Sequence, residues 1–467
     1  MGIAHVKEDP FTAVPASERR GPLTMGLLWI TMVTAFPSVL IGFQWFKDGI
    51  SLPQVIAGCA ISCLILLAFT IPSVQLGATT GQTYTGLSRS VFGKLGSRLI
   101  TVNLLWIFIA WYGLCSLFMA EAVHEFFHVA IPLPVMASAL ALLMALNNFF
   151  GFKGVANFAR YFAAPILIAW VVYTFAKAVW ASPISVLSEP SHVSFATAFT
   201  AISSFIIGFA LWGNEADYWR YSKPKMNFTV PPLVVALLIG EMIFPATGWL
   251  IAHLTGVTEY AAATALMSRF SFGGIAAIGI IVLGASYFAA NDSNLFGSKQ
   301  ACANLKALPH KIWVSVLAIL GAMTAAWLAV SGSAKGLEAI ASLNCIILPT
   351  PTVIIMCEWA LSTWMFRTES RFGERIPAFS ELPIVRWPSL IALICGMTVG
   401  LLTSGIIPGT ADLHVGICSV QSWLTSALMY IPLRILEHRM SISKARHAFE
   451  QSFKDDNLIA ETVAAVD

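Results

Sequence analysis

Long apolar runs separated by short polar stretches are the most regular feature of this sequence. Each run has roughly 18–25 residues, enough for an α-helix to cross the hydrocarbon core of a bilayer. The tenth run is long enough to be interrupted, and Pro349 and Pro351 favour a break within it. The runs predict twelve membrane-spanning helices, near 24–46, 52–75, 99–123, 131–150, 157–180, 195–218, 229–253, 273–297, 312–331, 337–363, 387–406 and 414–433.

Two of these helices, the first and the sixth, carry helix-breaking residues near their middles. The first contains Pro37 and then Gly42, and the sixth contains Gly208 and the Trp-Gly-Asn cluster at 212–214. A simple kink would explain Pro37 alone. Paired interruptions five helices apart, however, are typical of transporters built from inverted repeats, which place their substrate sites at such breaks. The predicted units are a first repeat at 24–180, a second repeat at 195–363 and two added helices at 387–433.

The composition agrees with a membrane protein. Hydrophobic residues make up 57% of the 467 residues and charged residues only 11%, whereas a soluble protein carries roughly 25% charged residues. The mean hydropathy is +0.77. The first twenty residues are polar and lack the apolar core of a cleavable signal peptide, so we expect an N-terminal tail. We expect the lipid bilayer, and no nucleic acid, as a partner.

The distribution of positive charge predicts how the chain crosses the membrane. With the N-terminus placed inside, 23 of the 27 lysines and arginines fall in segments on the cytoplasmic side. Cytoplasmic loops carry such an excess by the positive-inside rule. We therefore expect cytoplasmic tails at 1–23 and 434–467 and a location in the cell (inner) membrane.

Aromatic and amide side chains interrupt two of the apolar helices. Trp111 lies in the middle of the third helix, away from the membrane interfaces where tryptophan is usual. A flat indole in a midplane cavity suits stacking on a flat heterocycle. Asn291 and Asn294 follow a long apolar run in the eighth helix, and their amides offer both donors and acceptors to a nucleobase-like ring. The alternatives are a buried packing tryptophan and a hydrogen-bonded cluster between helices.

With these residues the chain resembles the nucleobase:cation symporter-1 family, the purine–cytosine permease group that also contains hydantoin and allantoin carriers. The resemblance implies an all-α integral membrane fold of twelve helices, with the five-plus-five inverted repeat of the leucine-transporter group and broken helices 1 and 6. It is carried by TAFPS at 34–38, AWYG at 110–113, GNEADYWRY at 213–221 and ANDSN at 290–294.

The resemblance also implies a substrate site. The heterocycle would lie between Trp111 of helix 3 and an aromatic residue of helix 6, either Phe209 or Trp212, with Asn291 near the substrate. Family members often carry glutamine one turn from the helix-3 tryptophan, where this chain has phenylalanine and cysteine. The amide that reads the ring must then come from elsewhere, and the candidates are Asn214, Asn294 and Asn103.

The residues before Asn291 bear on the coupling ion. Sodium-coupled members of the family place serine or threonine there, but this chain has Ala289 and Ala290. Sodium is a hard cation that needs oxygen ligands, so the loss of two hydroxyl groups should weaken such a site. Ser286, one turn earlier, offers one oxygen. We expect proton coupling, and the alternative is a sodium-coupled carrier of hydantoin-like, allantoin-like or other small solutes.

Proton coupling needs a titratable group within the membrane. Glu241, in the apolar run of the seventh helix, is the leading candidate, and Glu215 and Asp292 follow it. The alternative for Glu241 is a permanently protonated packing residue. Glu358 is expected at the inner end of its helix, paired with an arginine or lysine.

One further motif belongs to a different class of protein. His124, Glu125 and His128 match the H-E-x-x-H pattern of zinc proteases, in which both histidines share a helical face. The motif has no evident third ligand, so a membrane metalloenzyme is kept only as the alternative from another class. We predict a monomeric secondary transporter, not an enzyme, that imports a purine, cytosine or related planar heterocycle by alternating access and uses no cofactor beyond the transported cation.

Overall fold

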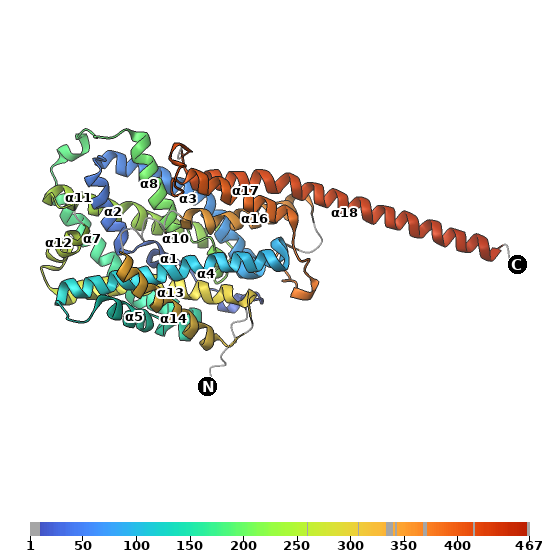
Figure 1. Cartoon of the computed structure of the whole chain (residues 1–467), viewed down its shortest axis with the longest axis horizontal. Helices are drawn as coiled ribbons and strands as arrows, with labels where there is room; N and C mark the ends of the chain where they lie inside the picture. The colour runs from blue at the N-terminus through green and yellow to red at the C-terminus, as the bar shows by residue number, and fades with distance from the viewer. Residues whose placement is uncertain are drawn as a thin grey trace.

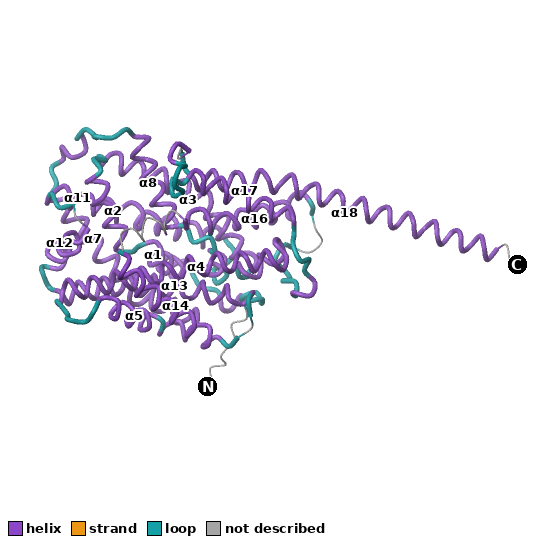
Figure 2. The backbone as a smooth tube through the Cα atoms, viewed as in Figure 1, coloured by secondary structure: helices purple, strands orange, loops and turns teal. Residues whose placement is uncertain are grey.

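A computed structural model describes residues 10–464 apart from 259, 307, 333–339, 341–342, 368–370 and 414–415. In these residues the elements of secondary structure are helices, joined by loops. The helices form one bundle, and no strand joins them in this part of the chain (Figures 1 and 2). The last helix continues beyond the bundle by itself, shown in red in Figure 1.

Helices occupy all twelve predicted spans, and several spans consist of two pieces. An unpredicted helix, α12 (Tyr260–Phe272), lies between the seventh and eighth spans, and residues 337–339 and 341–342 of the tenth lie outside the described residues. The spans are α1 (Pro22–Val33) with α2 (Phe36–Lys47), α3 (Leu52–Thr80), α4 (Tyr84–Phe127), α5 (Leu133–Met144), α6 (Gly151–Phe158) with α7 (Ala164–Ala181), α8 (Phe195–Ala210) with α9 (Glu215–Trp219), α10 (Met226–Leu237) with α11 (Phe244–Thr255), α13 (Ala276–Ala301), α14 (His310–Ser331), 343–347 with α16 (Pro349–Ala360), α17 (Trp387–Thr403) and α18 (Cys418–Ala464).

Length and hydropathy alone identify eight spans in the described chain: seven single helices and the bent pair α1–α2. One of the seven is the stretch Leu133–Ala181, whose 49 residues would make a helix of about 73 Å, against a hydrocarbon core of ~30 Å. A 3-10 turn at Leu146–Phe150 divides it into the predicted fourth and fifth helices. Three further spans are supplied by the shorter apolar helices α8 and α17 and by α18.

The first transmembrane helix is broken, as predicted. Its two halves are bent by 47°, and Thr34 and Ala35 between them have extended backbone. Pro37 lies in the first turn of α2, where a backbone N–H would have no acceptor within the helix. The lack of an N–H in proline therefore removes no helical hydrogen bond there. The amide of Phe36 donates to the Ser286 hydroxyl at 3.2 Å, so α13 satisfies a backbone group that the break leaves free.

The sixth transmembrane helix is broken at 211–214, so the prediction that it also breaks at Gly208 is wrong, since Gly208 is helical. Gly213 has φ of 73°, and a Cβ there would lie 2.5 Å from the carbonyl oxygen of Leu348. Glu215 stabilises the broken segment, because its Oε1 accepts hydrogen bonds from the backbone amides of Trp212 and Gly213 at 3.2 and 2.9 Å.

The N-terminal segment lies across the ends of two helices at one end of the bundle. Arg19 donates to the carbonyls of Ala78 at 2.5 Å and Ser222 at 3.2 Å. The amide of Arg20 donates to the carbonyl of Tyr221 at 2.6 Å. These bonds tie the N-terminal segment to α3 and to the chain that follows α9.

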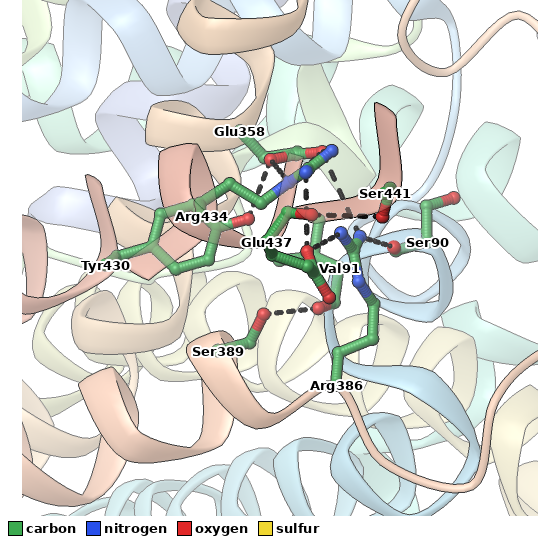
Figure 3. A network of polar contacts seen from close by, with 9 residues as sticks. All are labelled: Ser90, Val91, Glu358, Arg386, Ser389, Tyr430, Arg434, Glu437 and Ser441. Atoms are coloured by element: carbon green, nitrogen blue, oxygen red, sulfur yellow. Dashed lines mark hydrogen bonds and ion pairs between the residues drawn. The ribbon is translucent and has the colours of Figure 1, made fainter. Parts of the chain in front are cut away.

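A largely buried ion-pair network fastens the middle of α18 to the same end of the bundle (Figure 3). Arg434 contacts Glu358 at 2.9 Å, which confirms the predicted pairing of this carboxylate. The guanidinium of Arg386 donates to the carboxylate of Glu437 at 3.0 Å and to the carbonyl of Ser90 at 2.5 Å. Since the N-terminal segment also contacts the start of α4, where Arg89 lies over the Phe11 ring, both ends of the described chain lie on one side of the bundle.

Candidate functional site

A small cavity of about 30 Å³ lies where the breaks of helices 1 and 6 meet α4, α13 and the start of the tenth helix. This volume is far below the roughly 300–1,000 Å³ of small-ligand pockets, so side chains that line the cavity must move before a heterocycle can enter. Aromatic and aliphatic side chains dominate its walls, and two amides interrupt them. The lining residues are Met32, Ala35, Phe108, Trp111, Cys115, Phe209, Leu211, Trp212, Ala290, Asn294 and Asn344.

The three predicted aromatic residues all line this cavity. Trp111 comes from α4, Phe209 from the last turn of α8 and Trp212 from the break itself. Trp111 and Phe209 contact each other edge to face, and Trp212 packs against Phe108 with ring centroids 5.4 Å apart. The site therefore presents two aromatic pairs, one beside the other, on which a flat ring can stack once the rings separate.

Two polar groups of the predicted set face this aromatic surface. The indole Nε1 of Trp212 is buried and has no hydrogen-bond partner among the described residues. Asn294 lines the cavity, and its Nδ2 donates weakly to the Oδ1 of Asn291 at 3.4 Å. An indole N–H and an amide can fix the orientation of a heterocycle that stacking alone would leave free.

Asn291 and Asn214 do not line the cavity, although both were predicted to bind the substrate. The Nδ2 of Asn291 donates to the carbonyl of Tyr112 at 3.0 Å and to the hydroxyl of Ser116 at 2.9 Å, which ties α13 to α4. The Nδ2 of Asn214 donates to the carboxylate of Asp217 at 2.9 Å. The amide N–H groups of both residues are thus used in hydrogen bonds within the protein.

Asn344 lines the cavity but was missed by the sequence reasoning. It lies in the short helical stretch at 343–347 before α16 and is 2% exposed. Its Nδ2 donates to the carbonyls of Gly208 and Leu211, both at 2.7 Å. The available signal was an asparagine inside an apolar run, which in a membrane helix needs a partner.

The runner-up carboxylates Glu215 and Asp292 are held by hydrogen bonds outside the cavity. Besides the two backbone amides at the break, Glu215 accepts from the Ser73 hydroxyl at 2.8 Å. Asp292 accepts from the side-chain amides of Asn147 at 2.8 Å and Asn148 at 3.3 Å, in the turn between the fourth and fifth helices. Both carboxylates hold the fold together by accepting from several donors.

Glu241 has a different environment. It is 0% exposed, and neither carboxyl oxygen has a hydrogen-bond partner in the described part of the chain. It lies in a π-helical stretch, Leu238–Ile243, between α10 and α11, and such stretches are frequent at functional sites. The preceding Gly240 abuts the backbone of Val33, where α1 ends. The residue before Glu241 thus lies next to the break of helix 1.

The predicted cation residues of α13 provide few oxygens. The Ser286 hydroxyl accepts the amide of Phe36, and this bond uses one of its lone pairs. Ala289 packs in an apolar cluster with Ala163 and Ala285. At the two positions where sodium-coupled family members are expected to have hydroxyl ligands, this chain therefore has alanines, one packed in this cluster and one in the cavity lining.

The H-E-x-x-H motif at the end of α4 does not have the helical geometry expected for it. His128 ends the helix with φ of 48°, so the two histidines do not share a helical face. The Nε2 of His124 lies 2.6 Å from the carbonyl oxygen of Ile131. No three His, Cys, Asp or Glu side chains are grouped so as to hold a metal ion in the described residues.

Comparison with known protein families gives one match that spans most of the chain. Residues 13–424 match the family of permeases for cytosine/purines, uracil, thiamine and allantoin. The cytosine permease of Escherichia coli K12 is 24% identical over 443 residues, which cover 93% of this chain and 96% of that protein. The purine-uracil permease NCS1 of Arabidopsis thaliana is 24% identical over 266 residues, covering 51% of this chain and 43% of that protein.

Solved structures share the fold. Mhp1, a nucleobase-cation-symport-1 family transporter in a closed conformation with bromovinylhydantoin bound, has a TM-score of 0.71 at 18% identity, covering 93% of this chain and 96% of that one. A sodium-coupled sialic acid symporter has a TM-score of 0.63 at 12% identity, covering 92% and 93%. These likenesses confirm the predicted all-α transporter fold with broken helices 1 and 6. The boundaries of the two repeats and the roles of the site residues stay predictions.

Proposed function

The chain belongs to the family of permeases for cytosine/purines, uracil, thiamine and allantoin, and we propose that it imports a nucleobase or a related planar heterocycle, purine or cytosine first among them, by symport with a proton. A permease moves its substrate without covalent change, so the chain is a membrane transporter and not an enzyme. The transported cation is the cofactor that this function requires.

The cavity at the two helix breaks carries the substrate proposal. Its aromatic walls match the π-face of a heterocycle, and Trp212 offers an indole N–H that lacks a partner within the described chain. No lysine, arginine, aspartate or glutamate is among its lining residues, so a neutral ring fits it better than an amino acid, whose charged groups would need partners. The proposed working unit is a monomer.

Glu241 carries the proton proposal. An ionised carboxylate without a partner costs several kcal/mol in a protein interior. The buried carboxyl group of Glu241 is therefore suited to the neutral acid in this conformation and to the anion when the helices move and admit water. Since the neighbouring Gly240 abuts the end of α1, a motion at the break of helix 1 would reach Glu241 through the backbone.

The alanines of α13 support a proton over sodium. A sodium site between helix 1 and α13 would need several oxygens, and Ala289 and Ala290 supply no side-chain oxygen. The sodium-coupled carrier of hydantoin-like or allantoin-like solutes is therefore the second choice.

The location of the chain ends supports the proposed topology. The N-terminal segment and the middle of α18 are both fastened at one side of the bundle, near the start of α4. With 23 of 27 lysines and arginines assigned to that side, we place it in the cytoplasm and the protein in the cell (inner) membrane.

Counterflow tests the substrate class without reference to the coupling ion. Proteoliposomes loaded with an excess of one unlabelled heterocycle are diluted into the same labelled compound at equal pH and equal sodium on both sides. The compounds are cytosine, adenine, hypoxanthine, uracil, allantoin and a hydantoin. We expect transient accumulation of cytosine or a purine, absent from empty liposomes. Counterflow of none of the six would contradict the proposal, and counterflow of allantoin or the hydantoin alone would favour the second choice.

A further inference from the structure

Asn344 joins the break of helix 6 to the cavity. The helix α8 ends at Ala210, and the carbonyls near its end have no helical partner. Asn344 donates one hydrogen bond to the carbonyl of Gly208 and one to that of Leu211, both at 2.7 Å. The side chain from the tenth helix thus satisfies two backbone groups at the point where the sixth helix opens.

These two bonds fix the orientation of the Asn344 amide. A carboxamide has two N–H donors and one carbonyl oxygen. Both donors are directed at backbone carbonyl groups. An amide turned the other way would place its own Oδ1 against these carbonyl oxygens. The Oδ1 of Asn344 is therefore the free end, and it is buried without a hydrogen-bond partner among the residues described.

The residue belongs to the cavity wall. Asn344 lines the same space as Trp111, Phe209 and Trp212, and the Nε1 of Trp212 is a second buried polar atom without a partner in the described chain. One wall thus offers an acceptor and a donor in an otherwise aromatic site. On α4, the positions one turn from Trp111 are Phe108 and Cys115, which provide no amide.

We propose that Asn344 is a specificity-determining residue whose Oδ1 accepts a hydrogen bond from an N–H group of the planar heterocycle, while its Nδ2 holds the broken end of α8. This inference rests on the proposed function. It specifies the substrate class further, because the heterocycle must present a ring N–H or an exocyclic amino group to this oxygen. A ring without that donor leaves the oxygen unpaired, and sites built around such a hydrogen bond reject analogues that lack it.

The arrangement also relates substrate binding to the helix break. The same side chain contacts the substrate and the carbonyls of Gly208 and Leu211. A movement of α8 relative to the tenth helix would therefore shift the acceptor that the substrate uses. A test must separate these two roles, since loss of the amide removes both.

Equilibrium binding to the purified full-length protein tests the inference. Labelled cytosine and adenine are the parent probes. The competitors each lack one donor: 2-pyrimidinone and purine have no exocyclic amino group, and 1-methylcytosine and 9-methyladenine have no ring N–H. The measured quantity is the ratio of affinities for parent and analogue, in the wild-type protein and in variants of Asn344.

We expect the wild-type protein to prefer a parent over one of its analogues by at least about tenfold. Asn344→Ala should lower that preference to below about threefold, mainly by lowering the affinity for the parent compound. Asn344→Gln keeps the carboxamide, with its donors and its acceptor, and should retain more of the preference than Asn344→Ala. Gln44→Ala, a substitution of a half-buried amide on α2 outside the cavity lining, is the matched control and should bind as the wild type does.

The outcomes separate the two proposals. If Asn344→Ala does not fold, Asn344→Thr replaces it, because its hydroxyl can still donate to one carbonyl, whereas its oxygen lies nearer the backbone and does not reach the place of Oδ1. Equal weakening of parent and analogue, with the preference unchanged, would show a merely structural role and overturn the inference alone. A wild-type protein that binds parent and analogues equally would overturn it too. No binding of either parent would overturn the proposed function and this inference with it.

Discussion

The indole of Trp111 and the phenyl ring of Phe209 meet edge to face, with ring centroids 5.7 Å apart and planes inclined by 81°. A heterocycle stacked between two parallel rings needs them about 7–8 Å apart, since each stacking contact takes about 3.5–4 Å. The observed pair therefore occupies the space of the proposed substrate. Binding must rotate or displace one of the two rings, and Phe209 lies at the last turn before the break of helix 6.

Loss of the Trp111 ring should weaken substrate binding. Stacking on an aromatic side chain is worth about 1–3 kcal/mol per base, so Trp111→Ala should raise the Kd by about 5- to 150-fold. Equilibrium binding of labelled cytosine or adenine measures the change. Trp106→Ala is the control, since Trp106 lies on the same helix but is 41% exposed. Equal effects of the two substitutions would contradict a role for Trp111 in stacking.

Gly42 should be required for the packing of α2 against α11. A Cβ at this position would meet the amide of Trp249 and the backbone of Gly248, because the two helices touch through their backbones. Gly42→Ala should destabilise the protein by about 1–3 kcal/mol, measured as a lower Tm in detergent. Gly284→Ala is the matched control, because a Cβ there meets only the end of Met119 at 3.7 Å. A wild-type Tm in Gly42→Ala would show that the helices can separate freely.

Glu215 should act on stability and not on coupling. Its carboxylate accepts from two amides at the break of helix 6 and from Ser73, so Glu215→Ala leaves three buried donors and should cost about 2–5 kcal/mol. Glu215→Gln keeps an acceptor oxygen and should cost less. The pH profile of uptake should be the same in Glu215→Gln and the wild type. A displaced pH profile with an unchanged Tm would instead identify Glu215 as the coupling group.

The positions of the two breaks show what the sequence could and could not predict. Pro37 and the Gly213 region correctly marked the interrupted helices, because both residue types disfavour an α-helix interior. The break of helix 1 nevertheless lies before Pro37, since proline fits the first turn of a new helix. The exact break depends on tertiary partners such as Ser286 and Leu348, which are 250 and 135 residues away in sequence and leave no local signal.

The amides show the same limit within the site. Asn291 and Asn294 are three residues apart and share a helical face, so the pattern could not tell that one faces Tyr112 while the other lines the cavity. Asn344 stands alone in an apolar run, and its role depends on carbonyl groups of the sixth helix that only the fold brings near. Local pattern identified the helices, whereas the side chains that line the cavity were settled by packing between helices.

Glu241 is central to the account, because the proposed proton coupling rests on this residue. Proteoliposomes loaded at neutral pH are diluted into acidic medium without sodium, or into medium at the internal pH with sodium outside, and the accumulation of the compound that shows counterflow is measured. We predict accumulation with the proton gradient alone, and its loss in Glu241→Gln with counterflow retained, whereas Glu215→Gln accumulates as the wild type does. Accumulation that requires sodium, or that persists in Glu241→Gln, would contradict the account.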